Sequence, residues 1–291
     1  MRRGGARWRW AALWLAAAGA CDRDDAAGDA GAPFVDDAAG TCPAGMALVR
    51  GGEFVMGSSD LSGVAADGAS APAHRVRVRS FCLDETPVTA VAYVACVDAG
   101  RCPTPAMISA PGCAYQTGGF VEPGREAAPM NCVDWSEADT FCRAWANGDG
   151  GAALPTEAQW EFAATNGGAT RYPWGDAAPR DQLCWSGTGA VLRSRPCLVT
   201  ERAASARGLR DMVGNVSVWT QDWFANYAAA GAVPVDPSGP PTGRVRTARG
   251  PSFGADRVDV VAPTLRSLYA PTYRAPQLGF RCARALVGNP G

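Results

Sequence analysis

An early stretch of the chain alternates apolar and polar residues in the manner of β-structure. Valines alternate with arginines over residues 75–83, which predicts a half-buried strand. Before it, two short apolar runs at 45–49 and 51–57 flank Arg50 and paired glycines, and this spacing predicts a β-hairpin. The small, polar residues of 58–72 predict a loop between the hairpin and the strand.

Further along, the apolar residues recur with a helical period. Val91, Val94 and Val97 share one helical face and Gly100 follows them, so a helix is predicted over residues 89–99.

Two further helices are predicted from capping signals at their starts. Asp134 lies three residues before Glu137, a cap-like pair that precedes a helix over residues 136–146. Thr156 and Gln159 have the spacing of a capping box and begin another helix.

Regular structure is predicted to be sparse elsewhere. Residues 101–130 are rich in proline and glycine and indicate an irregular insertion, and turns dominate after residue 165. There is no internal repeat and no alternating strand–helix–strand pattern, which argues against a Rossmann or barrel fold. The pattern favours a loop-rich α+β domain stabilised by disulfides and by aromatic residues such as Trp174, Trp185, Trp219, Trp223 and Phe253.

The chain begins with a segment typical of an export signal. Arginines precede an apolar run from Trp10 to Ala20. This run is shorter than the roughly 20 residues that span a bilayer, so residues 1–21 are interpreted as a signal peptide. Ala-Gly-Ala-Cys at 18–21 is compatible with a lipoprotein cleavage site, with Cys21 as the lipidated residue. A plain cleaved signal with a chance cysteine is the alternative.

The following residues divide into a tether, a domain and a tail. Residues 22–41 carry six aspartates and little to bury, which predicts a disordered acidic tether. Residues 42–286 are long enough for one sizeable core, and 287–291 form a tail. We therefore expect an exported, membrane-anchored lipoprotein that faces the periplasm or the cell surface.

Charge and composition exclude several classes of function. The net charge is −1 and no basic patch stands out, so nucleic acid is not an expected partner. The chain contains no lysine, which excludes a lysine Schiff base. His74 is the only histidine, and we interpret it as an exposed strand residue rather than a member of a Ser-His-Asp triad.

The cysteine count predicts disulfides. Eleven cysteines are present, and ten remain when Cys21 is set aside, an even number in an exported chain. Cys-x-x-Cys does not occur, which argues against a zinc site. We expect Cys184 and Cys197 to form a local pair, and Cys96 to pair with Cys102 or with Cys113.

Five motifs together resemble the formylglycine-generating enzyme (sulfatase-modifying factor) family. They are Leu-Pro-Thr-Glu-Ala-Gln-Trp-Glu-Phe at 154–162, Tyr-Pro-Trp-Gly-Asp at 172–176, Asp-Met-Val-Gly-Asn-Val at 211–216, Arg-Gly-Pro-Ser-Phe at 249–253 and Leu-Gly-Phe-Arg-Cys at 278–282. The resemblance implies a C-type-lectin-like fold with little regular secondary structure. It also implies a disulfide between Cys142 and Cys282.

The resemblance also identifies a departure in the chemistry. Oxidases of that family bind copper(I) through two cysteines, and the equivalent places here fall near Ala255 and Val260. Neither side chain offers the soft ligand that copper(I) prefers, so copper is not an expected cofactor. No catalytic set is therefore assigned. The resemblance implies instead a remnant cleft, built by residues near Trp219, Arg249, Ser252 and Arg266.

Calcium is the one metal that the resemblance suggests. In the family, the region that corresponds to residues 214–219 binds a structural calcium ion. Here, Asp211 and the carbonyl groups of Gly214 and Val216 could supply part of the ligands. Val218 stands where the family has a glutamate, which removes one hard oxygen ligand.

These observations favour a binding or accessory module without copper-dependent cysteine oxidation. Its partner would be a peptide, a glycan or an envelope protein, and the membrane would be reached through the N-terminal lipid. The alternative is a protein-modifying oxidoreductase of the formylglycine-generating type that acts on exported sulfatases or other proteins.

Overall fold

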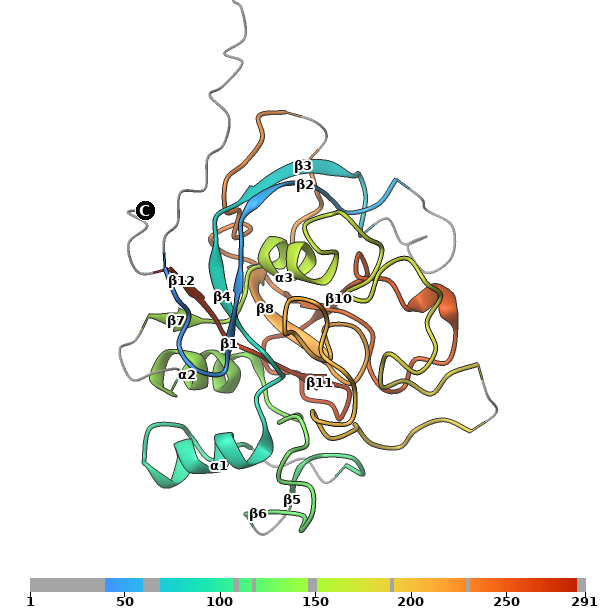
Figure 1. Ribbon diagram of the computed structural model, residues 1–291. Helices are drawn as coiled ribbons and strands as arrows, with labels where there is room; N and C mark the ends of the chain where they lie inside the picture. The colour runs from blue at the N-terminus through green and yellow to red at the C-terminus, as the bar shows by residue number, and fades with distance from the viewer. Residues whose placement is uncertain are drawn as a thin grey trace, which may run out of the picture. The chain divides into compact units, whose positions relative to one another are not determined.

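Figure 1 shows the computed structural model of the chain. The structure describes residues 40–59, 69–106, 110–116, 119–145, 151–188, 191–228 and 231–286. The chain divides into two units, Met1–Pro33 and Phe34–Gly291, and every described residue belongs to the second. The predicted signal peptide with Cys21, nearly all of the acidic tether and the tail at 287–291 lie outside the described residues.

The described residues form an α+β domain with short elements and long connections. Its helices are α1 (Ala90–Asp98), α2 (Trp135–Trp145) and α3 (Glu157–Ala164), with a 3-10 turn at Val258–Val260. The strands are β1 (Met46–Val49), β2 (Gly52–Met56), β3 (His74–Val78), β4 (Phe81–Asp84), β5 (Tyr115–Gln116), β6 (Phe120–Val121), β7 (Ala152–Ala153), β8 (Ser217–Trp223), β9 (Arg246–Arg249), β10 (Arg266–Tyr269), β11 (Leu278–Gly279) and β12 (Ala283–Ala285). The sparse regular structure agrees with the sequence pattern.

The predicted hairpin between the first two apolar runs is wrong. β1 pairs antiparallel with β4 and β2 pairs antiparallel with β3, so the two runs lie on the same side of one long ladder. The register is continuous, because Val49 faces Phe81 and Gly52 faces Val78. The glycines after Arg50 therefore interrupt the ladder without reversing the chain. The predicted strand at 75–83 is likewise split into β3 and β4.

The three predicted helices are present, and the two caps that the sequence predicts are formed. Thr156 Oγ1 accepts from Gln159 N at 3.1 Å while Gln159 Oε1 accepts from Thr156 N at 3.0 Å, a complete capping box. Asp134 and Glu137 make the same reciprocal pair before α2.

The buried face of α1 differs from the prediction. It consists of Ala90, Tyr93 and Cys96, whereas Val91 is 50% exposed. The valines follow helical spacing, but the larger Tyr93 ring packs in the core, stacked on Phe141 at 5.6 Å.

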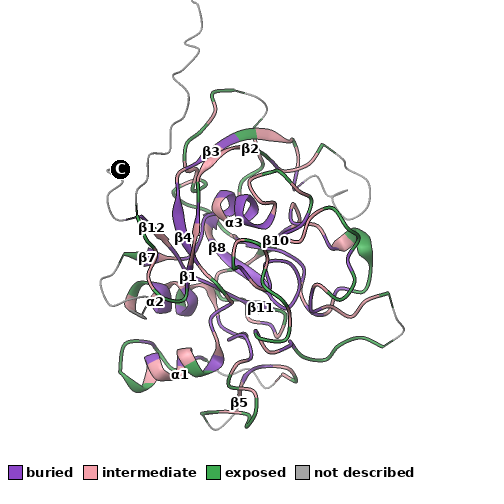
Figure 2. Cartoon of the chain, viewed as in Figure 1, coloured by how far each residue is buried: buried purple, intermediate pink, exposed green. Residues whose placement is uncertain are grey.

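Two four-stranded sheets organise the domain. One has the order β1-β4-β12-β7, and the other has the order β10-β9-β8-β11. Figure 2 shows β8 and α3 as largely buried elements, and Trp160 from α3 and Trp219 from β8 are fully buried. α3 contacts β8 and β9, so the second sheet and this helix together support the surface that carries the candidate site.

Five disulfides pair all ten cysteines of the described residues: Cys42–Cys82, Cys96–Cys102, Cys113–Cys132, Cys142–Cys282 and Cys184–Cys197. Of the two partners left open for Cys96, the structure has Cys102. The Cys142–Cys282 bridge joins α2 to the segment between β11 and β12 across 140 residues. It therefore ties the first sheet to the helical side of the core.

Candidate functional site

An open cleft of about 380 Å³ lies where the loop after β9 meets β10 and the segment before β11. Its lining includes Ser217, Ser252, Ala255, Val260, Tyr269 and Tyr273, and we call it the serine–tyrosine cleft.

The backbone of the loop after β9 is held by close packing and by serine hydroxyls. Gly250 has φ +80°, and a Cβ there would lie 2.8 Å from Trp160 Cζ2, so only glycine fits this turn. Ser217 Oγ donates to the Gly250 carbonyl at 2.7 Å, and Ser252 Oγ accepts from Gly254 N at 3.3 Å. These bonds present Ser252 at the cleft.

None of the described residues that line the cleft offers a thiol. Ala255 and Val260, at the positions where the family resemblance places the copper-binding cysteines, both line it. Every cysteine among the described residues is in a disulfide. A disulfide sulfur cannot act as the thiolate ligand that copper(I) needs, so the described residues do not fit a two-thiolate copper site.

Two tyrosines give the cleft its most distinctive surface. The rings of Tyr269 and Tyr273 stack with centroids 4.6 Å apart, and Tyr273 is 44% exposed. The edge of Tyr269 meets Trp219, with ring centroids 5.9 Å apart, which holds the pair in place. Burial raises the pKa of Tyr269, so its phenol stays neutral. Such a platform can stack on a ligand while the serine hydroxyls form hydrogen bonds.

The four residues predicted for one cleft lie in different places. Ser252 lines the serine–tyrosine cleft, but Trp219 and Arg249 are fully buried beneath the surface. Trp219 Nε1 donates to the Val133 carbonyl at 3.1 Å, and Arg249 pairs with Glu161. Arg266 lines a separate cavity. The structure therefore places the four residues in different surroundings, because the polar groups of Trp219 and Arg249 are bonded inside the core, and the remnant cleft stays a prediction.

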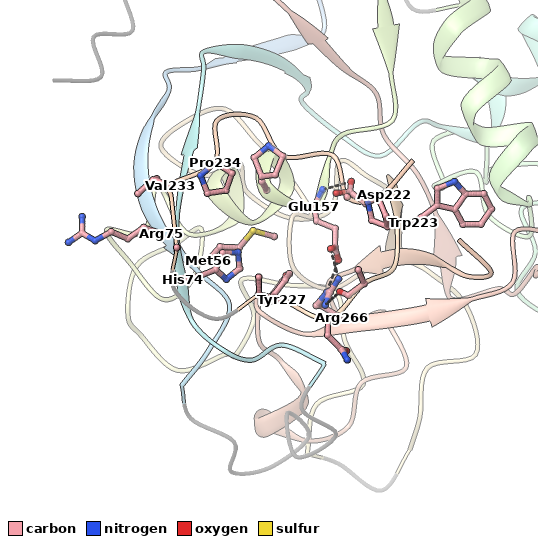
Figure 3. A pocket seen from close by; sticks show the side chains of 18 of the residues that line it. Met56, His74, Arg75, Glu157, Asp222, Trp223, Tyr227, Val233, Pro234 and Arg266 are labelled. Carbon is pink, nitrogen blue, oxygen red and sulfur yellow. Dashed lines mark hydrogen bonds and ion pairs between the residues drawn. The ribbon is translucent and has the colours of Figure 1, made fainter. Parts of the chain in front are cut away.

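That separate cavity measures about 490 Å³ and brings Arg266 together with residues that the sequence did not connect with it (Figure 3). Arg266 donates from Nε to Glu157 Oε1 at 2.9 Å and from Nη2 to Glu157 Oε2 at 2.7 Å. Asp222 lies at the same wall and is 4% exposed. Sequence reasoning missed Asp222 because its contact with Glu157 joins residues 65 positions apart.

His74 also differs from its expected place. It is half-buried, and its ring lies 4.5 Å from the Tyr227 ring. Its Nδ1 lies 3.0 Å from the Pro72 carbonyl, which can only accept, so we assign the proton to Nδ1. The residue lines the 490 Å³ cavity and keeps part of its surface exposed.

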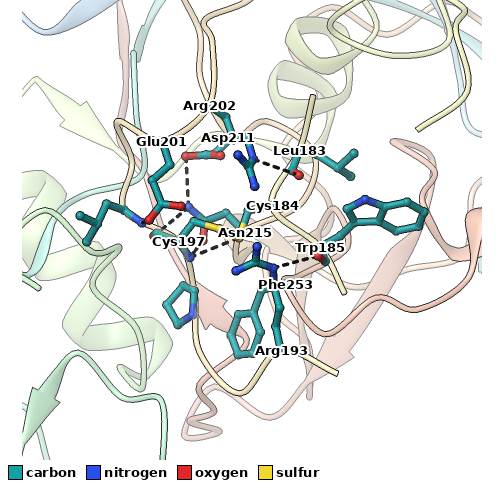
Figure 4. Close-up of a disulfide and its surroundings, with 12 residues drawn as sticks. Leu183, Cys184, Trp185, Arg193, Cys197, Glu201, Arg202, Asp211, Asn215 and Phe253 are labelled. Atoms are coloured by element: carbon teal, nitrogen blue, oxygen red, sulfur yellow. Dashed lines mark hydrogen bonds between the residues drawn. A yellow bond between two sulfur atoms is a disulfide. The ribbon is translucent and has the colours of Figure 1, made fainter. Parts of the chain in front are cut away.

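The segment expected to hold calcium packs against the Cys184–Cys197 disulfide (Figure 4). Asn215 Oδ1 accepts from Cys197 N at 3.1 Å, and its Nδ2 donates to Asp211 Oδ2 at 3.1 Å. Burial raises the pKa of Asp211 to about 6, and its Oδ1 has no hydrogen-bond partner.

The oxygen atoms around Asp211 that could act as metal ligands are fewer than the six to eight that calcium usually takes. Val218 is fully buried in the core, and the nearby positive charges of Arg281, Arg202 and Arg210 oppose a cation. The described residues contain no group of three or more His, Cys, Asp or Glu side chains that could hold a metal. Calcium binding through Asp211, Gly214 and Val216 stays a prediction.

The fold, the disulfides and the cleft define a domain of the sulfatase-modifying type. A family model described as "Sulfatase-modifying factor enzyme 1-like domain" matches residues 33–286. The chain belongs to this family.

The similar proteins include enzymes with different named activities. The formylglycine-generating enzyme of Streptomyces coelicolor is 33% identical over 289 residues, covering 82% of this chain and 88% of that protein. A hercynine oxygenase of Mycolicibacterium thermoresistibile is 33% identical over 242 residues, covering 73% of this chain and 52% of that protein.

Solved structures agree on the fold. PvdO from Pseudomonas aeruginosa superposes with a TM-score of 0.65 at 22% identity, covering 83% of this chain and 94% of that one. Treponema denticola variable protein 1 superposes with a TM-score of 0.63 at 21% identity, covering 82% of this chain and 94% of that one. At this identity the likeness concerns the fold alone.

Proposed function

We propose that the protein is an exported, lipid-anchored member of the family that binds a peptide, a glycan or an envelope protein in the serine–tyrosine cleft. It does so without copper-dependent cysteine oxidation. The observation that carries this proposal is a cleft lined by Ala255 and Val260 in a domain whose described cysteines are all in disulfides. The stacked pair Tyr269 and Tyr273 supports a role in binding.

A test of catalysis separates this proposal from its alternative, a formylglycine-generating oxidoreductase. The purified protein is loaded with copper(I) and incubated with oxygen and a Cys-x-Pro-x-Arg peptide, and mass spectrometry follows formylglycine. We expect no product above a metal-free control and no stoichiometric copper, because the cleft offers no thiolate. The Streptomyces coelicolor relative serves as the positive control. Product from this chain would contradict the proposal and favour the oxidoreductase.

A binding experiment tests the other part of the proposal, that the serine–tyrosine cleft binds a ligand. Peptide and glycan arrays are probed with the protein and with Tyr273→Ala, which removes the exposed ring of the stack. We expect binders of one chemical class whose signal falls about tenfold or more in the variant, since stacking and burial at such a ring contribute on the order of 1–2 kcal/mol. Signals that Tyr273→Ala leaves unchanged would place the binding elsewhere. Val191→Ala, an exposed change outside the cleft, is the control.

The proposed anchor rests on the basic and apolar start of the chain and on Cys21. None of the helices in the described residues is long and apolar enough to cross a membrane. In a bacterial host we expect the protein to fractionate with membranes and to carry a diacylglycerol on Cys21, detected by mass spectrometry. Cys21→Ser is expected to move the protein to the soluble fraction. A soluble parent protein, or a variant that stays in the membrane, would overturn the anchor.

A further inference from the structure

The 490 Å³ cavity is distinct from the serine–tyrosine cleft and shares none of its lining residues. Figure 3 shows side chains from β2, β3, α3, β8 and β10 around it. Its apolar wall includes Met56, Ala158, Val233 and Pro234. A volume of this size, with an apolar wall and few polar groups, is typical of a small-molecule site.

One polar group in this cavity is incompletely satisfied. Asp222 is 4% exposed, and its Oδ2 accepts from Glu157 N at 2.9 Å, which caps the start of α3. Its Oδ1 accepts no hydrogen bond from the described residues, and none of their arginines lies within ion-pair distance of it. A buried carboxylate without a cation or a full set of donors is costly, so this oxygen is poised to accept from a ligand.

Among the described residues, the ion pairs around Asp222 leave its own carboxylate without a cation. Arg266 pairs with Glu157, and Arg249 pairs with Glu161, so these four charges cancel. Asp222 is the third carboxylate of the cluster. Burial, together with the charge of Glu157, raises the pKa of Asp222 to about 8. A proton therefore balances the cluster near neutral pH in the absence of another cation.

Arg266, the cation beside Asp222 at the cavity wall, is already engaged, which makes an anionic ligand a poor match. Besides its two bonds to Glu157, Arg266 donates from Nη1 to the carbonyls of Ala69 at 2.6 Å and Ala225 at 3.1 Å. Arg246 also interacts electrostatically with Asp222. Its Cζ lies 3.7 Å from the ring centroid of Trp135 and 3.5 Å from that of Trp223. Arg246 Nε and Arg249 Nε have no hydrogen-bond partner among the described residues, but neither residue lines the cavity. At the cavity wall, Asp222 Oδ1 becomes an acceptor once its carboxyl group is ionised.

We propose that this cavity binds a small organic cation, a primary ammonium group on an apolar body. The ammonium donates to Asp222 Oδ1, and the apolar body packs against Met56, Val233 and Pro234. The ammonium takes the place of the proton on Asp222, so binding near neutral pH releases that proton. The site is independent of the proposed role of the serine–tyrosine cleft.

The test compares two probes of nearly the same shape, phenethylamine and 2-phenylethanol, by isothermal titration calorimetry with the purified protein at pH 7. We expect saturable one-to-one binding of the amine at least about tenfold tighter than the alcohol, because a hydrogen bond between charged groups is stronger than one between neutral groups. The heat should also depend on the ionisation enthalpy of the buffer, which reports proton release. Equal affinity for the two probes, or no amine binding, would overturn the proposal.

Matched variants assign the binding to this cavity. Asp222→Asn keeps an oxygen for Glu157 N and removes the charge, so amine affinity should fall about tenfold or more and proton release should disappear. Asp98→Asn, an exposed change at the end of α1, should leave both unchanged. Val233→Phe fills the cavity without touching the charged cluster, and it should abolish binding of the amine. Undiminished amine binding in Asp222→Asn or in Val233→Phe would overturn the proposal.

Discussion

Replacing Arg249 by methionine is expected to lower the free energy of unfolding by about 3–5 kcal/mol. The guanidinium is fully buried, pairs with Glu161, donates to the Pro263 carbonyl at 2.9 Å and lies 3.7 Å from Glu157. Methionine fills part of the volume but leaves the buried carboxylate of Glu161 without its cation, while Glu157 keeps its pair with Arg266. Because an unpaired charge in the core is far costlier than the loss of a surface ion pair, this effect should be among the largest for a single substitution.

Denaturant unfolding followed by tryptophan fluorescence measures the loss, with disulfides kept intact. Arg257→Met is the matched control, because Arg257 is exposed and forms a surface ion pair with Asp259, and no measurable change is expected there.

A second substitution identifies the cause of the loss. Burial raises the pKa of Glu161, and Arg249 opposes that rise. Glu161→Gln in the Arg249→Met background should therefore recover part of the lost stability, since it removes one stranded charge. An Arg249→Met protein as stable as its parent would show that the pair does not hold α3 to β9.

Removing the Cys142–Cys282 disulfide by alanine at both positions is expected to cost about 4–5 kcal/mol in the chain-entropy model. The bridge spans 140 residues, and both cysteines are fully buried. It links α2 to the segment that leads into β12, the strand between β4 and β7 in the first sheet. Without it, the unfolded chain regains the freedom of a very long loop.

The Cys96–Cys102 bridge supplies the matched comparison, because it spans only 6 residues. Its double alanine variant is expected to cost about 2 kcal/mol by the same relation. Thermal and denaturant unfolding of both variants would measure the difference. Equal losses for the two bridges would contradict the chain-entropy account and would point to local packing as the main contribution of each disulfide.

The sequence predicted the local features of the fold well. The capping box of Thr156 and Gln159 and the pair of Asp134 with Glu137 are formed by residues three positions apart, so their hydrogen bonds can be inferred from spacing alone. The family motifs likewise indicated the fold, because glycines such as Gly250 meet backbone and packing requirements that few other residues satisfy.

Prediction from the sequence was wrong where strand pairing or side-chain burial depends on a partner residue far away in the chain. β1 and β2 pair with β4 and β3 rather than with each other, and nothing in the glycines after Arg50 distinguishes an interrupted ladder from a turn. Arg249 was expected at the cleft, but Glu161 offers it a buried partner 88 residues away. Charged residues in a motif indicate importance without showing whether they face solvent or core.

By itself, the sequence determined the family, the positions of the three helices and the lack of cysteine at positions 255 and 260. These depend on residue identity and on spacings of a few residues. Only the tertiary structure decided that Ser252 and Arg266 belong to different cavities, and that Asp222 has an oxygen left to accept. The reason is physical: burial and pairing are set by segments far apart in the chain, whose approach depends on how the whole core packs.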